Sequence, residues 1–134
     1  MTDTADLLAG VPLLSGLDRK QLDKLARDFS ERTFAPGAVI VREGDDHGVG
    51  FFVVAEGEGT VTVHGKEVGT IGPGSYFGEV ALISDRVRTA TVTATTDMRC
   101  LVMTLWDFRA FVRGDADVAW KLLQHVGEML HNRG

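Results

Sequence analysis

The period of the hydrophobic positions changes twice along the chain. Near the N-terminus, apolar side chains recur at i, i+3, i+4 and i+7, which is the spacing of one helix face. This stripe consists of Leu22, Leu25, Ala26 and Phe29. Asp18 precedes it and Gln21 follows three residues later, the pattern of a capping box. The pattern predicts a capped helix, preceded by a short helix near residues 3–9 and a packed apolar turn at 11–17.

From residue 32 to about residue 104, short β-rich runs alternate with turn signals. The runs are residues 38–41, 51–54, 60–64, 67–71, 89–94 and 98–103. Turn pairs such as Pro36-Gly37 and Gly65-Lys66 separate them, and Val61 and Val63 alternate with polar residues. About eight short strands at this spacing predict a jelly-roll barrel whose two layers face each other across an apolar core.

The helical period returns at the end of the chain. Thr104 and Asp107 form a second capping pair, which predicts a helix at 105–112 that Gly114 ends. A last helix is expected to begin at Asp115 or Asp117 and to reach about residue 131. Its apolar stripe recurs every fourth residue, at Val118, Leu122, Val126 and Leu130.

The predicted architecture is therefore mainly β with flanking helices: an eight-stranded β jelly-roll barrel with N-terminal helices and two C-terminal helices. A length of 134 residues fits one domain. We expect that single domain to span 1–134, with an N-terminal helical segment at 1–30, the barrel at 31–104 and the C-terminal helices at 105–131.

Composition narrows the possible functions. The formal net charge of −5 argues against a nucleic-acid surface. The apolar runs are shorter than a membrane span, and no secretory signal pattern is found, so we expect a cytoplasmic protein. The single cysteine, Cys100, lies in an apolar run and is predicted to be a buried thiol.

The segment from Phe77 to Val92 combines several recognition chemistries. Glu79 follows Gly78 at the expected start of a short helix, where free backbone N–H groups favour an anion. A carboxylate can accept hydrogen bonds from sugar hydroxyls. Equally, Glu79 can be a plain helix-start carboxylate stabilised by the helix dipole.

Arginine in the same segment can clamp phosphate oxygens. Arg86 and Arg88 both qualify, because residues two apart on a strand point the same way. Arg88 directly precedes the alternating strand, which favours it, and a solvated surface arginine is the alternative. Thr89 could contact a phosphate or a purine, or serve only as a β-branched strand residue.

An enzyme is a less economical interpretation. A metal-binding cupin would need a convergent cluster of ligands, often beginning with His-x-His. His47, His64, His125 and His131 are separated in the sequence and form no such motif. Nucleophile-elbow and phosphate-loop motifs are also missing from the sequence. We therefore predict no catalytic residues and no metal.

The ordered motifs resemble the cyclic nucleotide-binding domain family of cAMP receptor proteins, protein kinase regulatory subunits and gated channels. The runs Phe77–Leu82 and Arg88–Val92 resemble its phosphate-binding cassette, here spanning 74–92. Further matches are Val11–Leu17, Pro36-Gly37, Arg42–Asp45, Phe52–Val54 with Gly57, and Ile71–Gly74.

The resemblance implies a role for each matching residue. Arg88, in preference to Arg86, would bind the cyclic phosphate, and Glu79 the ribose 2′-hydroxyl. The backbone near Gly78, Val80 and Ala81 would supply further hydrogen bonds. The complete set of expected ligand-binding residues is Phe77, Gly78, Glu79, Val80, Ala81, Arg88 and Thr89.

The resemblance also implies a regulatory module without catalysis, whose ligand is cAMP by preference or cGMP. Ligand capture would move the C-terminal helix, and Met129 and Leu130 are candidates to cover the base. The output would pass to an effector protein or through a homodimer, without direct nucleic-acid or membrane binding. The alternatives are a protein-interaction module that keeps the fold without the ligand and, less favoured, a cupin-type metalloenzyme.

Overall fold

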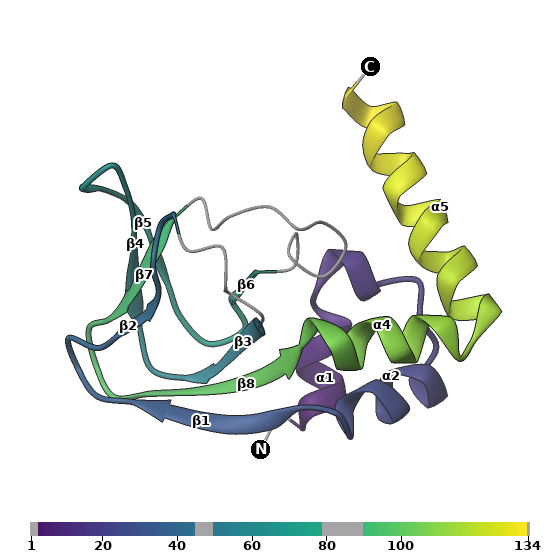
Figure 1. Cartoon of the computed structure of the whole chain (residues 1–134), viewed down its shortest axis with the longest axis horizontal. Coiled ribbons are helices and arrows are strands. Elements are labelled where there is room, and N and C mark those ends of the chain that lie inside the picture. Colours follow the sequence, from purple (N-terminus) through teal and green to yellow (C-terminus); the bar gives the residue numbers. More distant parts are fainter. Residues whose placement is uncertain (1–2, 45–49, 79–89, 134) are drawn as a thin grey trace. The chain divides into compact units, whose positions relative to one another are not determined.

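The computed structural model of the chain describes residues 3–44, 50–78 and 90–133 (Figure 1). It divides into two compact units. The helical unit contains Met1–Asp28 and Trp106–Gly134, and the β unit contains Phe29–Leu105. Each unit is described by itself.

The helical unit is built from helices of both ends of the chain. They are α1 (Thr4–Ala9), the 3₁₀ helix η1 (Pro12–Leu14), α2 (Arg19–Ala26), α4 (Leu105–Arg113) and α5 (Ala116–Arg133). The predicted capping box of α2 is confirmed, because Asp18 accepts the Gln21 N–H at 2.8 Å and Gln21 accepts the Asp18 N–H at 3.0 Å. Asp115, rather than Asp117, caps α5, since its Oδ1 accepts the N–H groups of residues 117 and 118.

A polar contact joins α2 to α5 within this unit. Gln21 is buried, and its Nε2 donates to Asp117 Oδ2 at 2.8 Å. Lys121 Nζ donates to Gln21 Oε1 at 2.9 Å. The buried amide is thus satisfied at both ends, as a buried polar group requires. This contact holds the first turns of α5 against α2.

The apolar stripe of α5 is buried over only half of its length. Val118 and Leu122 are buried, as the helical period predicts. Val126 is half-buried, and Leu130 is 64% exposed. The second half of α5 therefore leaves part of its predicted apolar stripe accessible.

In the part of the β unit that the structure describes, eight strands form two antiparallel sheets, which confirms the predicted fold (Figure 1). The strands are β1 (Ser30–Phe34), β2 (Val39–Val41), β3 (Gly50–Glu56), β4 (Gly59–Val63), β5 (Lys66–Ile71), β6 (Tyr76–Phe77), β7 (Thr91–Ala94) and β8 (Met98–Thr104). One sheet has the order β1-β8-β3-β6 and the other β2-β7-β4-β5. Apart from the β4–β5 hairpin, the paired strands are distant in sequence, as in a jelly roll.

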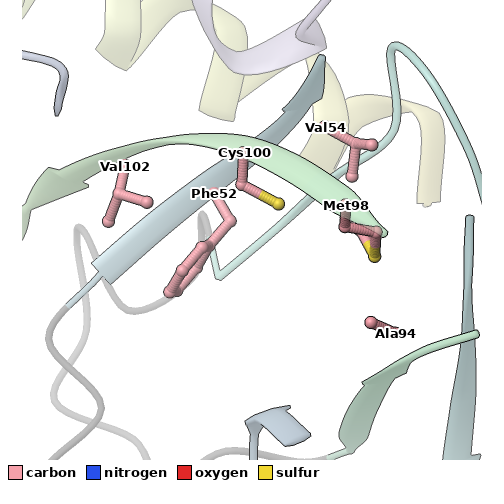
Figure 2. Packing of buried hydrophobic residues seen from close by; sticks show 6 residues of the cluster. All are labelled: Phe52, Val54, Ala94, Met98, Cys100 and Val102. Atoms are coloured by element: carbon pink, nitrogen blue, oxygen red, sulfur yellow. The ribbon is translucent and has the colours of Figure 1, made fainter. Parts of the chain in front are cut away.

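The interior of the β unit is apolar (Figure 2). Residues two apart on β3 and on β8 point to the same face and form most of the cluster. The cluster consists of Phe52, Val54, Ala94, Met98, Cys100 and Val102. Ala94 comes from β7, so the cluster contains side chains of both sheets. The predicted burial of Cys100 is confirmed, with 0% exposure.

In the ranges that the structure describes, no helix is both long and apolar enough to cross a membrane.

Candidate ligand-binding site

The predicted binding segment is anchored on a different sheet at each end. It is entered from β6, where Phe77 pairs with Phe52 of β3. It is left through β7, where Thr91 pairs with Thr62 of β4. Because β3 and β4 belong to different sheets, the two ends of the segment are held by opposite layers of the barrel.

The entry is held by main-chain hydrogen bonds to β3. Gly74 donates its N–H to the carbonyl of Val54, and Val54 donates back to the carbonyl of Ser75, both at 2.8 Å. Ser75 Oγ accepts the N–H of Gly72 at 3.0 Å, which closes the turn that Pro73 occupies. These bonds fix the point at which β6 begins.

Phe77 joins the entry to the barrel core. Its ring stacks on that of Phe52, with centroids 4.8 Å apart and planes 8° from parallel. Phe77 is half-buried and packs against the cluster in which Phe52 is buried. Gly78 follows with φ of 87°, a left-handed conformation that glycine adopts at little cost. The chain can therefore turn sharply directly after a packed ring.

The exit is held by side chains from two other turns. Thr91 Oγ1 accepts the N–H of Glu43 at 2.9 Å. The carboxylate of Glu43 in turn accepts the His64 N–H at 2.8 Å. Glu43 follows β2, and His64 lies in the turn between β4 and β5. Three chain segments thus meet at the first residue of β7.

Phe77 and Gly78 are the predicted ligand-binding residues that the structure describes. The other predicted positions, Glu79, Val80, Ala81, Arg88 and Thr89, lie outside the described residues, and so does the competing Arg86. Their roles stay predictions. The candidates for covering the base lie on α5, where Met129 is 50% and Leu130 64% exposed.

Sequence reasoning did not single out Phe52, Glu43, His64 or Thr91 as parts of one site. The first two lie in runs that carry the family resemblance, Phe52–Val54 and Arg42–Asp45, and Thr91 lies at the end of the cassette-like run. That signal marks turns and strands. It does not say which side chains meet across the sheets.

The titratable residues of the described ranges form no cluster of three or more His, Cys, Asp or Glu side chains that could hold a metal ion. Cys100 has an altered acidity, because burial raises its pKa to about 11. A buried, protonated thiol is a poor nucleophile and a poor metal ligand. Cys100 therefore acts as an apolar side chain of the core.

Comparisons with known proteins identify the domain type. The family model described as "Cyclic nucleotide-binding domain" matches residues 31–115. That range contains the whole β unit from β2 to β8, both anchors of the predicted binding segment, and α4.

A curated relative, the cAMP-dependent protein kinase regulatory subunit of Schizosaccharomyces pombe, is 42% identical over 94 residues. The match covers 69% of this chain and 23% of that protein. The chain spans less than a third of the length of the first curated relatives that it matches.

Solved structures agree with the fold. The N-terminal domain of a transcriptional regulator from Streptomyces coelicolor superposes with a TM-score of 0.89 at 30% identity, covering 96% of this chain and 95% of that one. The regulatory domain of Toxoplasma gondii protein kinase A, solved with cAMP, superposes with a TM-score of 0.73 at 30% identity, covering 81% and 42%.

Proposed function

This chain belongs to the cyclic nucleotide-binding domain family, and on that premise we propose that its β unit binds a cyclic nucleotide and acts as a regulatory module. The observation that carries the proposal is the match of the family model over residues 31–115. Within that range lie the residue types that one phosphate and one ribose hydroxyl require, on a segment with both ends anchored.

We propose that the ligand is held by a division of labour within the segment. Arg88 would neutralise the cyclic phosphate, because a guanidinium forms two parallel, charge-assisted hydrogen bonds to phosphate oxygens. Glu79 would accept from the ribose 2′-hydroxyl, which a carboxylate does and an amide does less strongly. The backbone at Gly78, Val80 and Ala81 would supply donors, and Thr89 a hydroxyl.

Of the two cyclic nucleotides, cAMP is the preferred ligand. Its support comes from relatives, since curated matches are regulatory subunits of cAMP-dependent protein kinase and a similar structure was solved with cAMP. A hydroxyl at Thr89 is compatible with either base, so cGMP is the second ligand to test.

The proposed role is binding and relay, without catalysis. Ligand capture would shift the balance between two positions of α5, because a ligand changes a conformational equilibrium through its different affinity for the two states. The exposed second half of α5 would then act on an effector protein or a second copy of the chain. A cytoplasmic location stays a prediction of the sequence.

Calorimetric titration with cAMP and cGMP tests the proposal. We expect saturable binding of cAMP, and Arg88→Leu should weaken it by about 2 kcal/mol or more, because the phosphate charge loses its partner. Arg86→Leu is the matched control and should leave affinity nearly unchanged. Circular dichroism of both variants checks that the fold survives.

Two outcomes would contradict this assignment. If neither nucleotide at millimolar concentration produced binding heat or a thermal shift, the alternative would be favoured, namely a protein-interaction module that keeps the fold. A larger loss from Arg86→Leu than from Arg88→Leu would keep the function and move the phosphate contact to Arg86.

A further inference from the structure

The carboxylate of Glu43 makes two contacts with one residue of another turn. Its Oε1 accepts the backbone N–H of His64 at 2.8 Å, and its Oε2 lies 3.1 Å from His64 Nδ1. The Glu43 side chain is 27% exposed, and that of His64 is 85% exposed. Partial burial on the glutamate side strengthens such a contact relative to a fully solvated pair.

His64 needs this support because its backbone is in an unusual conformation. It has φ of 52°, the one positive value recorded for a residue other than glycine in the described ranges, and Gly65 follows with φ of 79°. Positive φ at both central residues is typical of a tight two-residue hairpin turn, which usually carries Asn or Asp before glycine. The Glu43 carboxylate accepts the N–H that this conformation exposes, so the turn and the glutamate side chain stabilise each other's position.

The same glutamate reaches the exit of the binding segment through its backbone. The Glu43 N–H donates to Thr91 Oγ1 at 2.9 Å, a partly buried contact between residues 48 apart in sequence. Thr91 is the first residue of β7, and its neighbour Val92 pairs with both Val41 of β2 and Val61 of β4. Glu43 therefore connects the end of β2, the hairpin of β4 and β5, and the start of β7.

We propose that Glu43 is a positioning residue for ligand binding, with Thr91 and His64 as its partners. By holding Thr91, it fixes the end of the segment that carries Arg88 only three residues earlier. Holding Thr91 in one position would pre-organise the binding site for its ligand, which increases affinity without any contact to the ligand. This inference rests on the proposed function.

The alternative is a purely structural role, in which the contact stabilises the hairpin and nothing more. Affinity measured under conditions where every variant is fully folded separates the two roles. If the contact is purely structural, its loss lowers the urea midpoint of unfolding but leaves the dissociation constant for cAMP unchanged. Two substitutions at position 91 serve this purpose. Thr91→Val removes the hydroxyl that accepts from Glu43, and Thr91→Ser retains it.

The experiment titrates wild type, Glu43→Ala, Thr91→Val and Thr91→Ser with cAMP, and measures the urea midpoint of each without ligand. We expect Glu43→Ala and Thr91→Val to weaken cAMP binding about tenfold, which corresponds to about 1.4 kcal/mol. Thr91→Ser should stay within about twofold of wild type on the same scale. Glu67 is an exposed carboxylate of the same hairpin, so Glu67→Ala is the control and should change neither the cAMP affinity nor the urea midpoint.

Hydrogen exchange at the Glu43 amide reports the contact itself. We expect faster exchange in Thr91→Val than in Thr91→Ser. If the wild type binds cAMP and Glu43→Ala and Thr91→Val bind it with unchanged affinity, the positioning role is overturned and the proposed function stands. A wild type that binds neither nucleotide overturns the proposed function and this inference together.

Discussion

The rings of Phe52 and Phe77 stack face to face, with centroids 4.8 Å apart and an interplanar angle of 8°. Phe52 is buried in the cluster between the sheets, and Phe77 is the last residue before the left-handed Gly78. The start of the predicted binding segment is thus coupled to the core by one aromatic pair.

Replacing Phe77 should affect stability and binding together. Phe77→Leu should lower the unfolding free energy by about 1 kcal/mol, because it removes the ring pairing but keeps an apolar side chain. Phe77→Ala should lower the unfolding free energy by about 2–3 kcal/mol. This loss is at or below the low end of the range for a fully buried phenylalanine, because Phe77 is only half-buried. Urea unfolding measures both values, and cAMP titration should show weaker binding by Phe77→Ala.

Phe34→Ala is the matched control for Phe77→Ala, because Phe34 is a half-buried ring packed on the same cluster. It should lower stability without changing cAMP affinity. Equal effects of the Phe34 and Phe77 variants on affinity would show that the core as a whole, and not the entry of the segment, sets binding.

Gly57 should not tolerate a side chain. It has φ of 92°, and a Cβ there would collide with the carbonyl oxygen of Asp97 and lie 2.8 Å from Met98 Cα. Gly57→Ala combines left-handed strain with this clash, so we expect a loss of about 3 kcal/mol or more, beyond the roughly 1–2 kcal/mol of strain alone. Thermal and urea unfolding measure it.

Gly65→Ala separates the two contributions. Gly65 has φ of 79° with open space around the position of a Cβ, so only the strain applies there. A cost at Gly57 no larger than that at Gly65 would mean that β8 can shift to accept the methyl group.

The helical unit should lose stability in acid. The hydrogen bond from Gln21, together with Lys121, holds the pKa of Asp117 below its usual value of 3.8. A lowered pKa stabilises the folded state above the unfolded pKa, and that contribution disappears as the pH falls below about 3.8. We expect the stability difference between wild type and Asp117→Asn to shrink between pH 5 and pH 2.5. Urea midpoints at each pH measure it, and parallel curves for the two proteins would contradict the expectation.

Cys100 should be unreactive until the β unit unfolds. Its side chain is 0% exposed, and burial raises its pKa to about 11 from 9.0. Because the folded pKa is the higher one, the contribution to stability is complete below pH 9.0 and decreases as the pH rises toward 11. Labelling with iodoacetamide at pH 8 should be slow in buffer and fast in urea. Equally fast labelling in buffer and in urea would show that the core opens readily. Cys100→Ala is the control for labelling at other residues.

The sequence predicted elements whose signals are local. Asp18 and Gln21 are three residues apart, so the capping box of α2 could be recognised from spacing alone. The strands with apolar alternation or apolar runs, such as β3 and β4, were found for the same reason. The family resemblance added the order of the turns and named the cassette residues from Phe77 to Thr89.

Other elements could not be delimited from the sequence. β1, Ser30–Phe34, is exposed over four of its residues and carries no apolar alternation. It is a strand because it pairs with β8, from Ser30 opposite Val102 to Phe34 opposite Met98. β6 has only two residues, and it is likewise a strand because it pairs with β3.

By itself, the sequence determined the capping box of α2, most strand positions, the burial of Cys100 and the family to which the residues belong, because these depend on neighbours in the chain and on residue type. Tertiary structure decided the strand order and the partners. Contacts between Phe52 and Phe77, or between Glu43 and Thr91, join residues whose spacing in the chain carries no period. Such pairs depend on how two sheets close around one core, and that is a property of the whole β unit.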